Sequence, residues 1–228
     1  MRKLPLVTDR RYYVSLGDSQ SRNAADYTGV ASRFYERLTV RDSSLKMVPL
    51  ATDGATAATV RYVQLPRLRE MDVEPSVVTI TLGVSDLSRL AFGDAAGVCR
   101  ELKDHGKSLL SALRTTAPRA VLLFSTLYDP MDGTDATLAT AVQTFNEAIR
   151  TLATACNGRV AEIHAAFSGH GANVGDPLSS NELGENPDLY LCAGPDLSPV
   201  PNHNGASVFA ELLLNAYHAA LTEETTGA

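Results

Sequence analysis

Short apolar runs alternate with longer segments of helical periodicity along nearly the whole chain, and this alternation constrains the fold more than any other feature. Residues 77–82 (VVTITL) typify the strand-like runs, because they are rich in β-branched side chains. Residues 138–155 typify the helix-like segments, because their apolar side chains recur at helical spacing. Such alternation predicts a parallel sheet that is covered by helices on both faces.

The pattern also predicts where each element lies. Strands are expected at residues 12–16, 46–50, 77–82, 121–125 and 160–163. Helices are expected at residues 28–38, 56–65, 95–113, 138–155 and 208–217. The second helix is expected to end before Pro66, because proline cannot continue a helix without distortion. The strand runs are uniformly apolar, which is typical of a sheet buried on both sides.

One long stretch interrupts this rhythm. Residues 168–204 are rich in Gly, Pro, Asn, Asp and Ser and lack periodicity, and a loop of this length inside a domain is usually functional or disordered. Because it follows the last strand, it is expected to lie over the carboxyl edge of the sheet, where open α/β folds bind ligands. The chain shows no internal repeat and no linker, so residues 1–228 are interpreted as a single domain.

Charge and cysteine content exclude several classes of function. The net charge is −6 and the basic residues are scattered, which argues against a nucleic-acid partner. Three cysteines without CxxC spacing indicate neither a disulfide framework nor a zinc site, and no histidine has metal-ligand spacing to a carboxylate. No apolar run could span a bilayer and the N-terminus does not resemble a signal peptide, so a cytoplasmic location is expected. Nothing indicates the oligomeric state.

Small and polar residues follow the ends of the first three expected strands. The segments are SLGDSQS at residues 15–21, ATDGATAATV at residues 51–60 and TLGVSDL at residues 81–87. In the first, Ser19 can present its hydroxyl and its backbone N–H to one pocket, as a nucleophilic serine requires, although a simple turn explains the same residues equally well. In the second, Gly54 offers an N–H near a helix start, or merely marks that start. Three such strand ends in succession favour a functional site.

These segments, in this order, resemble the blocks of the GDSL/SGNH hydrolase family over nearly the full length of the chain. A fourth segment, PNHNG at residues 201–205, resembles the end of the family's last block, Asp-x-x-His-Pro-Asn-x-x-Gly. The resemblance implies a three-layer α/β/α fold of flavodoxin-like type with a five-stranded parallel sheet. It implies Ser19 as the nucleophile, with Ser19, Gly54 and Ser85 as the oxyanion hole. It implies a small-molecule substrate, no metal and no cofactor.

Two positions depart from the family's pattern. The Asn of the third block is replaced by Ser85, whose hydroxyl is a shorter donor than an amide. When Pro201, Asn202 and Gly205 are aligned with the Pro, Asn and Gly of the family's last block, the position of the catalytic His is occupied by Val200. Valine cannot accept a proton. His203 is the candidate replacement, with Asp196 orienting it, although a surface or capping role explains His203 equally well. His164 and His170 are alternative bases, since one closes the fifth expected strand and the other lies in the long loop.

Two functions are therefore expected as alternatives. In the first, a serine hydrolase or acyltransferase attacks an ester or thioester with Ser19, and His203 and Asp196 complete the triad. In the second, the fold is repurposed, for example in bacterial specialised metabolism. It then binds a small molecule or catalyses a non-hydrolytic step, such as a cyclisation or an elimination, without a full triad. The replacements at Ser85 and Val200 motivate this second hypothesis.

Overall fold

The computed structural model describes residues 11–21, 29–171, 183–193 and 199–226. Its centre is a five-stranded sheet of order β2-β1-β3-β4-β5, in which every neighbouring pair is parallel. The strands are β1 (Tyr12–Gly17), β2 (Lys46–Pro49), β3 (Pro75–Thr81), β4 (Val121–Ser125) and β5 (Arg159–Ala161). The expected α/β class and five-stranded parallel sheet are confirmed, with each strand within two residues of its predicted bounds.

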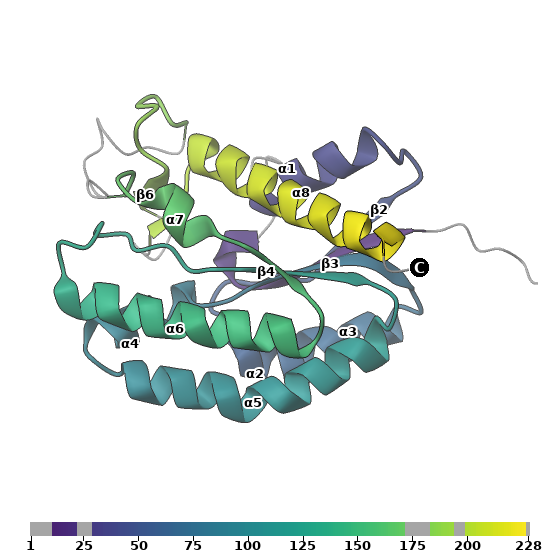
Figure 1. Ribbon diagram of the computed structural model, residues 1–228, viewed down its shortest axis with the longest axis horizontal. Coiled ribbons are helices and arrows are strands. Elements are labelled where there is room, and N and C mark those ends of the chain that lie inside the picture. The colour runs from purple at the N-terminus through teal and green to yellow at the C-terminus, as the bar shows by residue number, and fades with distance from the viewer. Residues whose placement is uncertain (1–10, 22–28, 172–182, 194–198, 227–228) are drawn as a thin grey trace, which may run out of the picture.

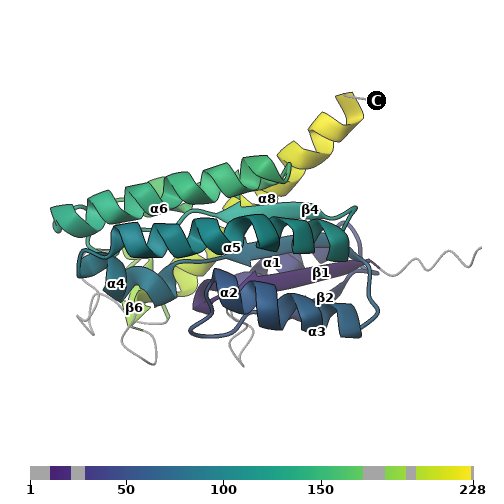
Figure 2. The ribbon, with the colours of Figure 1, turned by 90° about the horizontal axis from the view of Figure 1, so that it is seen from below.

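Helices cover both faces of this sheet, which gives three layers (Figure 1). The helices are α1 (Val30–Thr39), α2 (Ala57–Thr59), α3 (Leu65–Glu70), α4 (Leu87–Ala91), α5 (Ala95–Thr116), α6 (Ala136–Ala155), α7 (Ile163–Phe167) and α8 (His203–Thr226). Helices α1 and α8 pack together on one face. Helices α2, α3, α5 and α6 cover the other, where α5 and α6 run side by side (Figure 2).

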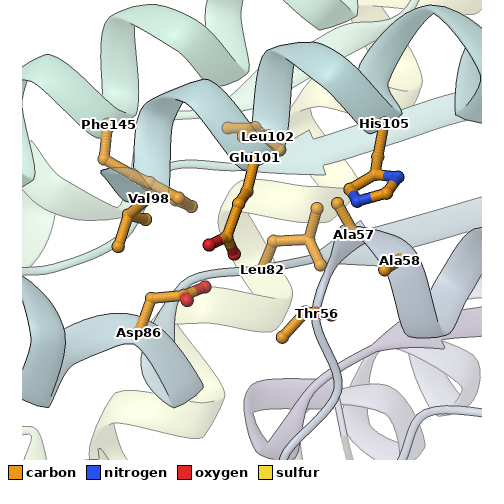
Figure 3. A pocket seen from close by; sticks show the side chains of 10 residues that line it. All are labelled: Thr56, Ala57, Ala58, Leu82, Asp86, Val98, Glu101, Leu102, His105 and Phe145. Atoms are coloured by element: carbon orange, nitrogen blue, oxygen red, sulfur yellow. The ribbon is translucent and has the colours of Figure 1, made fainter. Parts of the chain in front are cut away.

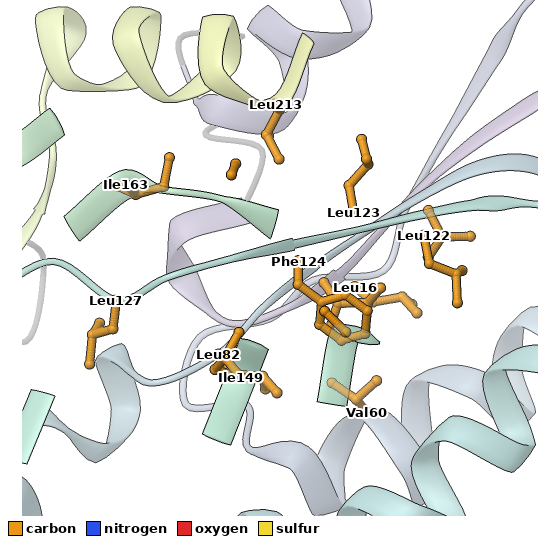
Figure 4. Close-up of a cluster of buried hydrophobic side chains, with 14 of the residues drawn as sticks. Leu16, Val60, Leu82, Leu122, Leu123, Phe124, Leu127, Ile149, Ile163 and Leu213 are labelled. Atoms are coloured by element: carbon orange, nitrogen blue, oxygen red, sulfur yellow. The ribbon is translucent and has the colours of Figure 1, made fainter. Parts of the chain in front are cut away.

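The hydrophobic core lies on both sides of the sheet. Leu213 of α8 lies on one side of β4, whereas Val60 and Ile149 lie on the other (Figure 4). Leu123 and Phe124 of β4 are both fully buried. Consecutive strand residues point to opposite faces, so a strand covered on both sides carries mostly apolar side chains at consecutive positions. This explains why the strand runs are predominantly apolar and do not alternate with polar residues.

The predicted end of the second helix at Pro66 is wrong. Between α2 and α3 the chain forms a π-helical turn, η2 (Val60–Gln64), and the helix continues through Pro66. The Leu65 N–H bonds the carbonyl of Val60, five residues earlier. Proline lacks an N–H and its ring clashes with a carbonyl of the preceding helical turn. The wider π turn leaves room for that ring, so the helix is not interrupted.

The last helix and the long loop also differ from expectation. Helix α8 begins at His203 because Asn202 caps it, with the Asn202 Oδ1 accepting from the Gly205 N–H at 3.0 Å. Within the loop, β6 (Leu191–Ala193) and β7 (Pro199–Pro201) form an antiparallel pair. The parts of the expected loop at residues 172–182 and 194–198 lie outside the described residues.

Candidate active site

The turns after β1 and β3 meet at the carboxyl edge of the sheet. From β1 the chain first adds β2 on one side and then β3, β4 and β5 on the other, so β1 and β3 flank the switch point of the sheet. Open α/β folds bind their ligands at such a switch point. Ser19 opens the 3₁₀ turn η1 (Ser19–Ser21), and Ser85 lies in the 3₁₀ turn η3 (Val84–Asp86). The two turns contact one another. Two of the predicted site residues therefore lie in neighbouring turns.

Gly17 allows this close approach. Its φ is +112°, and a Cβ atom there would lie 1.8 Å from the Thr81 carbonyl oxygen of β3. The Gln64 side chain bonds both peptide groups of Gly17, accepting from its N–H at 2.8 Å and donating to its carbonyl at 2.9 Å. Only glycine fits between these neighbours. The residue two positions before Ser19 therefore fixes the path of the chain into the turn.

Asp18 ties the two turns together. Its buried carboxylate accepts from the backbone N–H of Gln20 at 3.1 Å and from that of Val84 at 3.0 Å. Burial raises the pKa of Asp18, although these hydrogen bonds oppose the shift. Because both bonds anchor backbone groups and the side chain is fully buried, Asp18 positions the site and is not a base for it.

The three predicted oxyanion donors have no internal hydrogen-bond partner among the described residues. Within the described part of the chain, no hydrogen bond occupies the backbone N–H of Ser19, the backbone N–H of Gly54 or the hydroxyl of Ser85. Gly54 has a φ of +73° and lies in the exposed turn after β2. That loop is joined to the end of β1, since the Thr52 N–H bonds the Gly17 carbonyl at 3.0 Å. Donors free of internal partners are what a developing oxyanion needs.

Gln20, beside the nucleophile position, was not predicted to have any special role. Its side chain is only 1% exposed and interacts with the Asp18 carboxylate, whose pKa it acts to lower. Gln20 therefore belongs to the buried polar group that surrounds Asp18.

His203, the predicted base, is bonded to Arg33 of α1. The Arg33 Nη2 lies 2.7 Å from the His203 Nδ1, and the Arg33 Nη1 lies 3.0 Å from the Ser207 hydroxyl. A guanidinium can only donate, so Nδ1 is the acceptor and the ring proton is on Nε2. In a serine triad the arrangement is reversed: a carboxylate accepts from Nδ1–H and leaves Nε2 free to take a proton. No hydrogen bond joins His203 to Ser19.

Asp196, the predicted partner of His203, lies outside the described residues. Arg33 was missed by the sequence analysis, because it lies on an ordinary amphipathic helix and no motif distinguishes it. Its bond to His203 joins residues 170 positions apart. Only the packing of α1 against α8 brings them together.

The two alternative bases are held in different ways, His164 through its backbone and His170 through its ring. The backbone N–H of His164 donates to the Thr126 hydroxyl at 3.0 Å, at the start of α7. The His170 Nδ1 lies 2.7 Å from the Asp188 carbonyl, and its ring stacks on Tyr190 with centroids 3.9 Å apart. Neither histidine has a hydrogen bond to Ser19.

Val200 lies in the strand that contacts the Ser19 turn. It is the central residue of β7, pairs with Cys192 of β6 and is half-buried, and β7 contacts η1. The Tyr128 hydroxyl donates to the Pro199 carbonyl at 2.6 Å and so anchors this strand. The position that the resemblance assigns to the family's histidine therefore lies in a strand that contacts the Ser19 turn, but an apolar residue occupies it.

The described residues contain neither a metal-ligand cluster nor a membrane-spanning helix. In residues 11–21, 29–171, 183–193 and 199–226, no group of three His, Cys, Asp or Glu side chains could hold a metal ion. In the same part of the chain, no helix is both long and apolar enough to cross a membrane.

Comparisons with known proteins agree with this architecture. The GDSL-like lipase/acylhydrolase family model matches residues 15–183. No curated protein matches the chain.

Solved structures share this fold. The lipase Lip_vut3 from a goat rumen metagenome has a TM-score of 0.66 at 17% identity, and the match covers 90% of this chain and 96% of the lipase. The psychrotrophic esterase EstA from Pseudoalteromonas sp., solved with monoethylphosphonate as inhibitor, has a TM-score of 0.60 at 16% identity. The match covers 92% of this chain and 98% of EstA. Phospholipase A1 from Streptomyces albidoflavus has a TM-score of 0.56 at 19% identity, and the match covers 93% of this chain and 98% of the phospholipase. At these identities, the structural matches establish the fold.

Proposed function

The chain belongs to the GDSL-like lipase/acylhydrolase family, and on that premise we propose that it hydrolyses an ester or thioester of a small molecule, or transfers its acyl group, through an acyl-enzyme on Ser19. One observation carries the proposal. Within the described residues, no hydrogen bond occupies the Ser19 N–H at the switch point of the sheet, or the hydroxyl of Ser85 in the contacting turn. A nucleophile whose own N–H can stabilise the oxyanion needs this arrangement.

The proposed reaction has two steps. The Ser19 Oγ attacks the carbonyl carbon while a base takes its proton, and the resulting oxyanion accepts hydrogen bonds from Ser19, Gly54 and Ser85. Collapse of this intermediate releases the alcohol or thiol, which takes the proton back from the base. Water then attacks the acyl-enzyme to give the acid, or a second alcohol attacks it to give a new ester. The same base serves both steps.

We assign the base to His203, with Asp196 as its orienting carboxylate. The assignment requires His203 to leave Arg33, because the Arg33 bond keeps the proton on Nε2. Catalytic hydrogen bonds are often long or poorly aligned before substrate binds and tighten only in the complex. In the proposed competent state, a carboxylate takes the place of Arg33 at Nδ1, which leaves Nε2 free to take the proton of Ser19.

Two substitutions on α1 and one on α8 test this assignment. His203→Ala is expected to lower kcat/KM for p-nitrophenyl acetate on the order of 10²–10⁴-fold, the usual contribution of a general base. Arg33→Met is expected to raise kcat/KM, because it frees Nδ1. Arg37→Met is the matched control. It lies on the same helix and bonds Glu211 and the Ser207 carbonyl, but not His203, so its kcat/KM is expected to be unchanged.

The Arg33–His203 bond and Val200 favour a second candidate function. A member of the family without a working base would bind a small molecule, or catalyse a cyclisation or elimination that needs no acyl-enzyme. Full retention of ester hydrolysis in His203→Ala would contradict His203 as the base. Absence of ester hydrolysis in the wild type, together with saturable binding of an ester, would favour this second function.

A further inference from the structure

Gln64 bonds both segments that carry the backbone donors of the proposed oxyanion hole. Its side chain is 2% exposed and lies at the end of η2, which contacts β1. Its Oε1 accepts from the Gly17 N–H at 2.8 Å, and its Nε2 donates to the Gly17 carbonyl at 2.9 Å and to the Thr52 hydroxyl at 3.3 Å. Gly17 lies two residues before Ser19. Thr52 lies two residues before Gly54, so one buried amide links the two segments.

The turn that presents Gly54 begins at Thr52. The Ala55 N–H bonds the Thr52 carbonyl at 3.3 Å, which closes a turn that contains Gly54. The first residue of this turn makes two further bonds: its backbone N–H donates to the Gly17 carbonyl at 3.0 Å, and its hydroxyl accepts from Gln64. The position of Gly54 relative to β1 therefore depends on these two bonds.

Packing holds the other end of this turn less tightly. Thr56 and Ala57 line a small cavity of about 30 Å³ between α2 and α5 (Figure 3). A void leaves the atoms that line it without packing partners on one side. The bonds at the Thr52 end are therefore the ones that keep Gly54 at a fixed distance from Ser19.

The amide of Gln64 belongs to the π turn η2, and single π turns inside helices occur frequently at functional sites. Two neighbouring side chains at the end of this turn are both buried. Leu65 joins the hydrophobic core, whereas Gln64 faces the peptide groups of Gly17. Burying an amide costs free energy unless it is hydrogen-bonded, and its bonds to Gly17 and Thr52 remove that cost.

Two backbone donors must reach the same oxygen in the proposed reaction. A donor stabilises an oxyanion when it lies about 2.7–3.1 Å away, and a misplacement of about 1 Å can cost on the order of 100-fold in rate. We propose that Gln64 is a positioning residue for the oxyanion hole, because it fixes the distance between the N–H groups of Ser19 and Gly54 without touching the substrate. The inference rests on the proposed function, since it concerns the oxyanion that attack by Ser19 creates.

Gln64→Met removes the hydrogen bonds of the amide and keeps the approximate shape of the side chain. This variant is expected to lower kcat for p-nitrophenyl acetate on the order of 10- to 100-fold and to leave KM within about twofold of the wild-type value. KM is spared because the oxyanion exists only in the two chemical steps, and both steps use the same donors. Steady-state kinetics of the folded variant measure both constants.

Asn146→Leu is the matched control for Gln64→Met. The Asn146 side chain is also 2% exposed, and it also bonds both peptide groups of one residue. Its Oδ1 accepts from the Leu127 N–H at 2.7 Å, and its Nδ2 donates to the Leu127 carbonyl at 2.8 Å. These bonds join α6 to the loop after β4 and reach neither turn that carries a backbone donor. Asn146→Leu is therefore expected to lower stability and to keep the wild-type kcat.

Gln64→Glu tests the same role through pH. A protonated carboxyl group has one donor and one acceptor, so it can replace both bonds to Gly17, whereas a carboxylate cannot donate to the Gly17 carbonyl. Burial raises the pKa of a glutamate, and buried glutamates are known to titrate as high as about pH 9. The ratio of the variant's kcat to that of the wild type is therefore expected to fall on the order of 10- to 100-fold between about pH 5 and about pH 10. The corresponding ratio for Asn146→Asp is expected to stay constant.

A folded Gln64→Met variant with the wild-type kcat would overturn the inference, as would an equal fall in kcat in Asn146→Leu. If Gln64→Met does not fold, Gln64→Glu decides, and a kcat ratio that does not change with pH overturns the inference. Failure of the proposed function gives a different result: the wild type hydrolyses no ester, or Ser19→Ala keeps its activity, and both ideas fall. If Ser19→Ala is inactive while Gln64→Met is fully active, only the positioning role fails.

Discussion

Replacement of Ser19 by alanine is expected to lower kcat/KM for ester hydrolysis on the order of 10³- to 10⁶-fold, the range seen when a catalytic serine is removed. The loss follows because no acyl-enzyme can form without the hydroxyl, whereas the Ser19 backbone N–H and the rest of the oxyanion hole remain. Steady-state hydrolysis of p-nitrophenyl acetate measures the effect. The fold is expected to persist, because Ser19 makes no side-chain hydrogen bond within the described residues.

Ser21 provides the control for Ser19. It lies in the same turn, and its buried hydroxyl likewise has no partner among the described residues. Ser21→Ala is therefore expected to keep kcat/KM close to the wild-type value. A Ser19→Ala variant as active as Ser21→Ala would remove Ser19 from the mechanism.

Replacement of Gly17 by alanine is expected to lower the free energy of unfolding by more than about 4 kcal/mol, an exceptionally large effect for one methyl group. The added Cβ would lie 1.8 Å from the Thr81 carbonyl oxygen, and that oxygen belongs to the backbone of a central strand. The left-handed φ of +112° adds strain for any residue with a side chain. The fold can relieve the contact only by separating β1 from β3. Urea denaturation, or loss of soluble protein, measures the effect.

Gly133 provides the control for Gly17. Its φ is +77°, but a Cβ atom there would meet nothing within 4 Å. Gly133→Ala therefore reports the conformational strain alone, expected at about 1–2 kcal/mol. Equal destabilisation by the two substitutions would show that the contact with Thr81 is relieved at little cost.

Much of the fold could be predicted because periodicity is local. Residues 121–125 were predicted as a strand from their apolar run alone, and β4 has those bounds. The prediction failed where other effects decide the structure. A π turn accommodates Pro66, and β6 and β7 are three-residue strands that contain no recognisable pattern. The early start of α8 depends on the cap that Asn202 supplies.

The site was predictable only where its residues follow strand ends. Ser19 and Ser85 lie in contacting turns because β1 and β3 are neighbours in the sheet. The partner of His203 could not be predicted, since the packing of distant helices brings Arg33 to it.

Mass spectrometry of the folded protein after treatment with a fluorophosphonate tests the central claim most directly. The probe reacts with a serine hydroxyl only where that hydroxyl is activated and its oxyanion hole is formed. The predicted result is one phosphonate adduct, located on the peptide that contains Ser19 and absent in Ser19→Ala. A folded wild-type protein that carries no adduct on Ser19, under conditions that label a known serine esterase completely, would contradict the account.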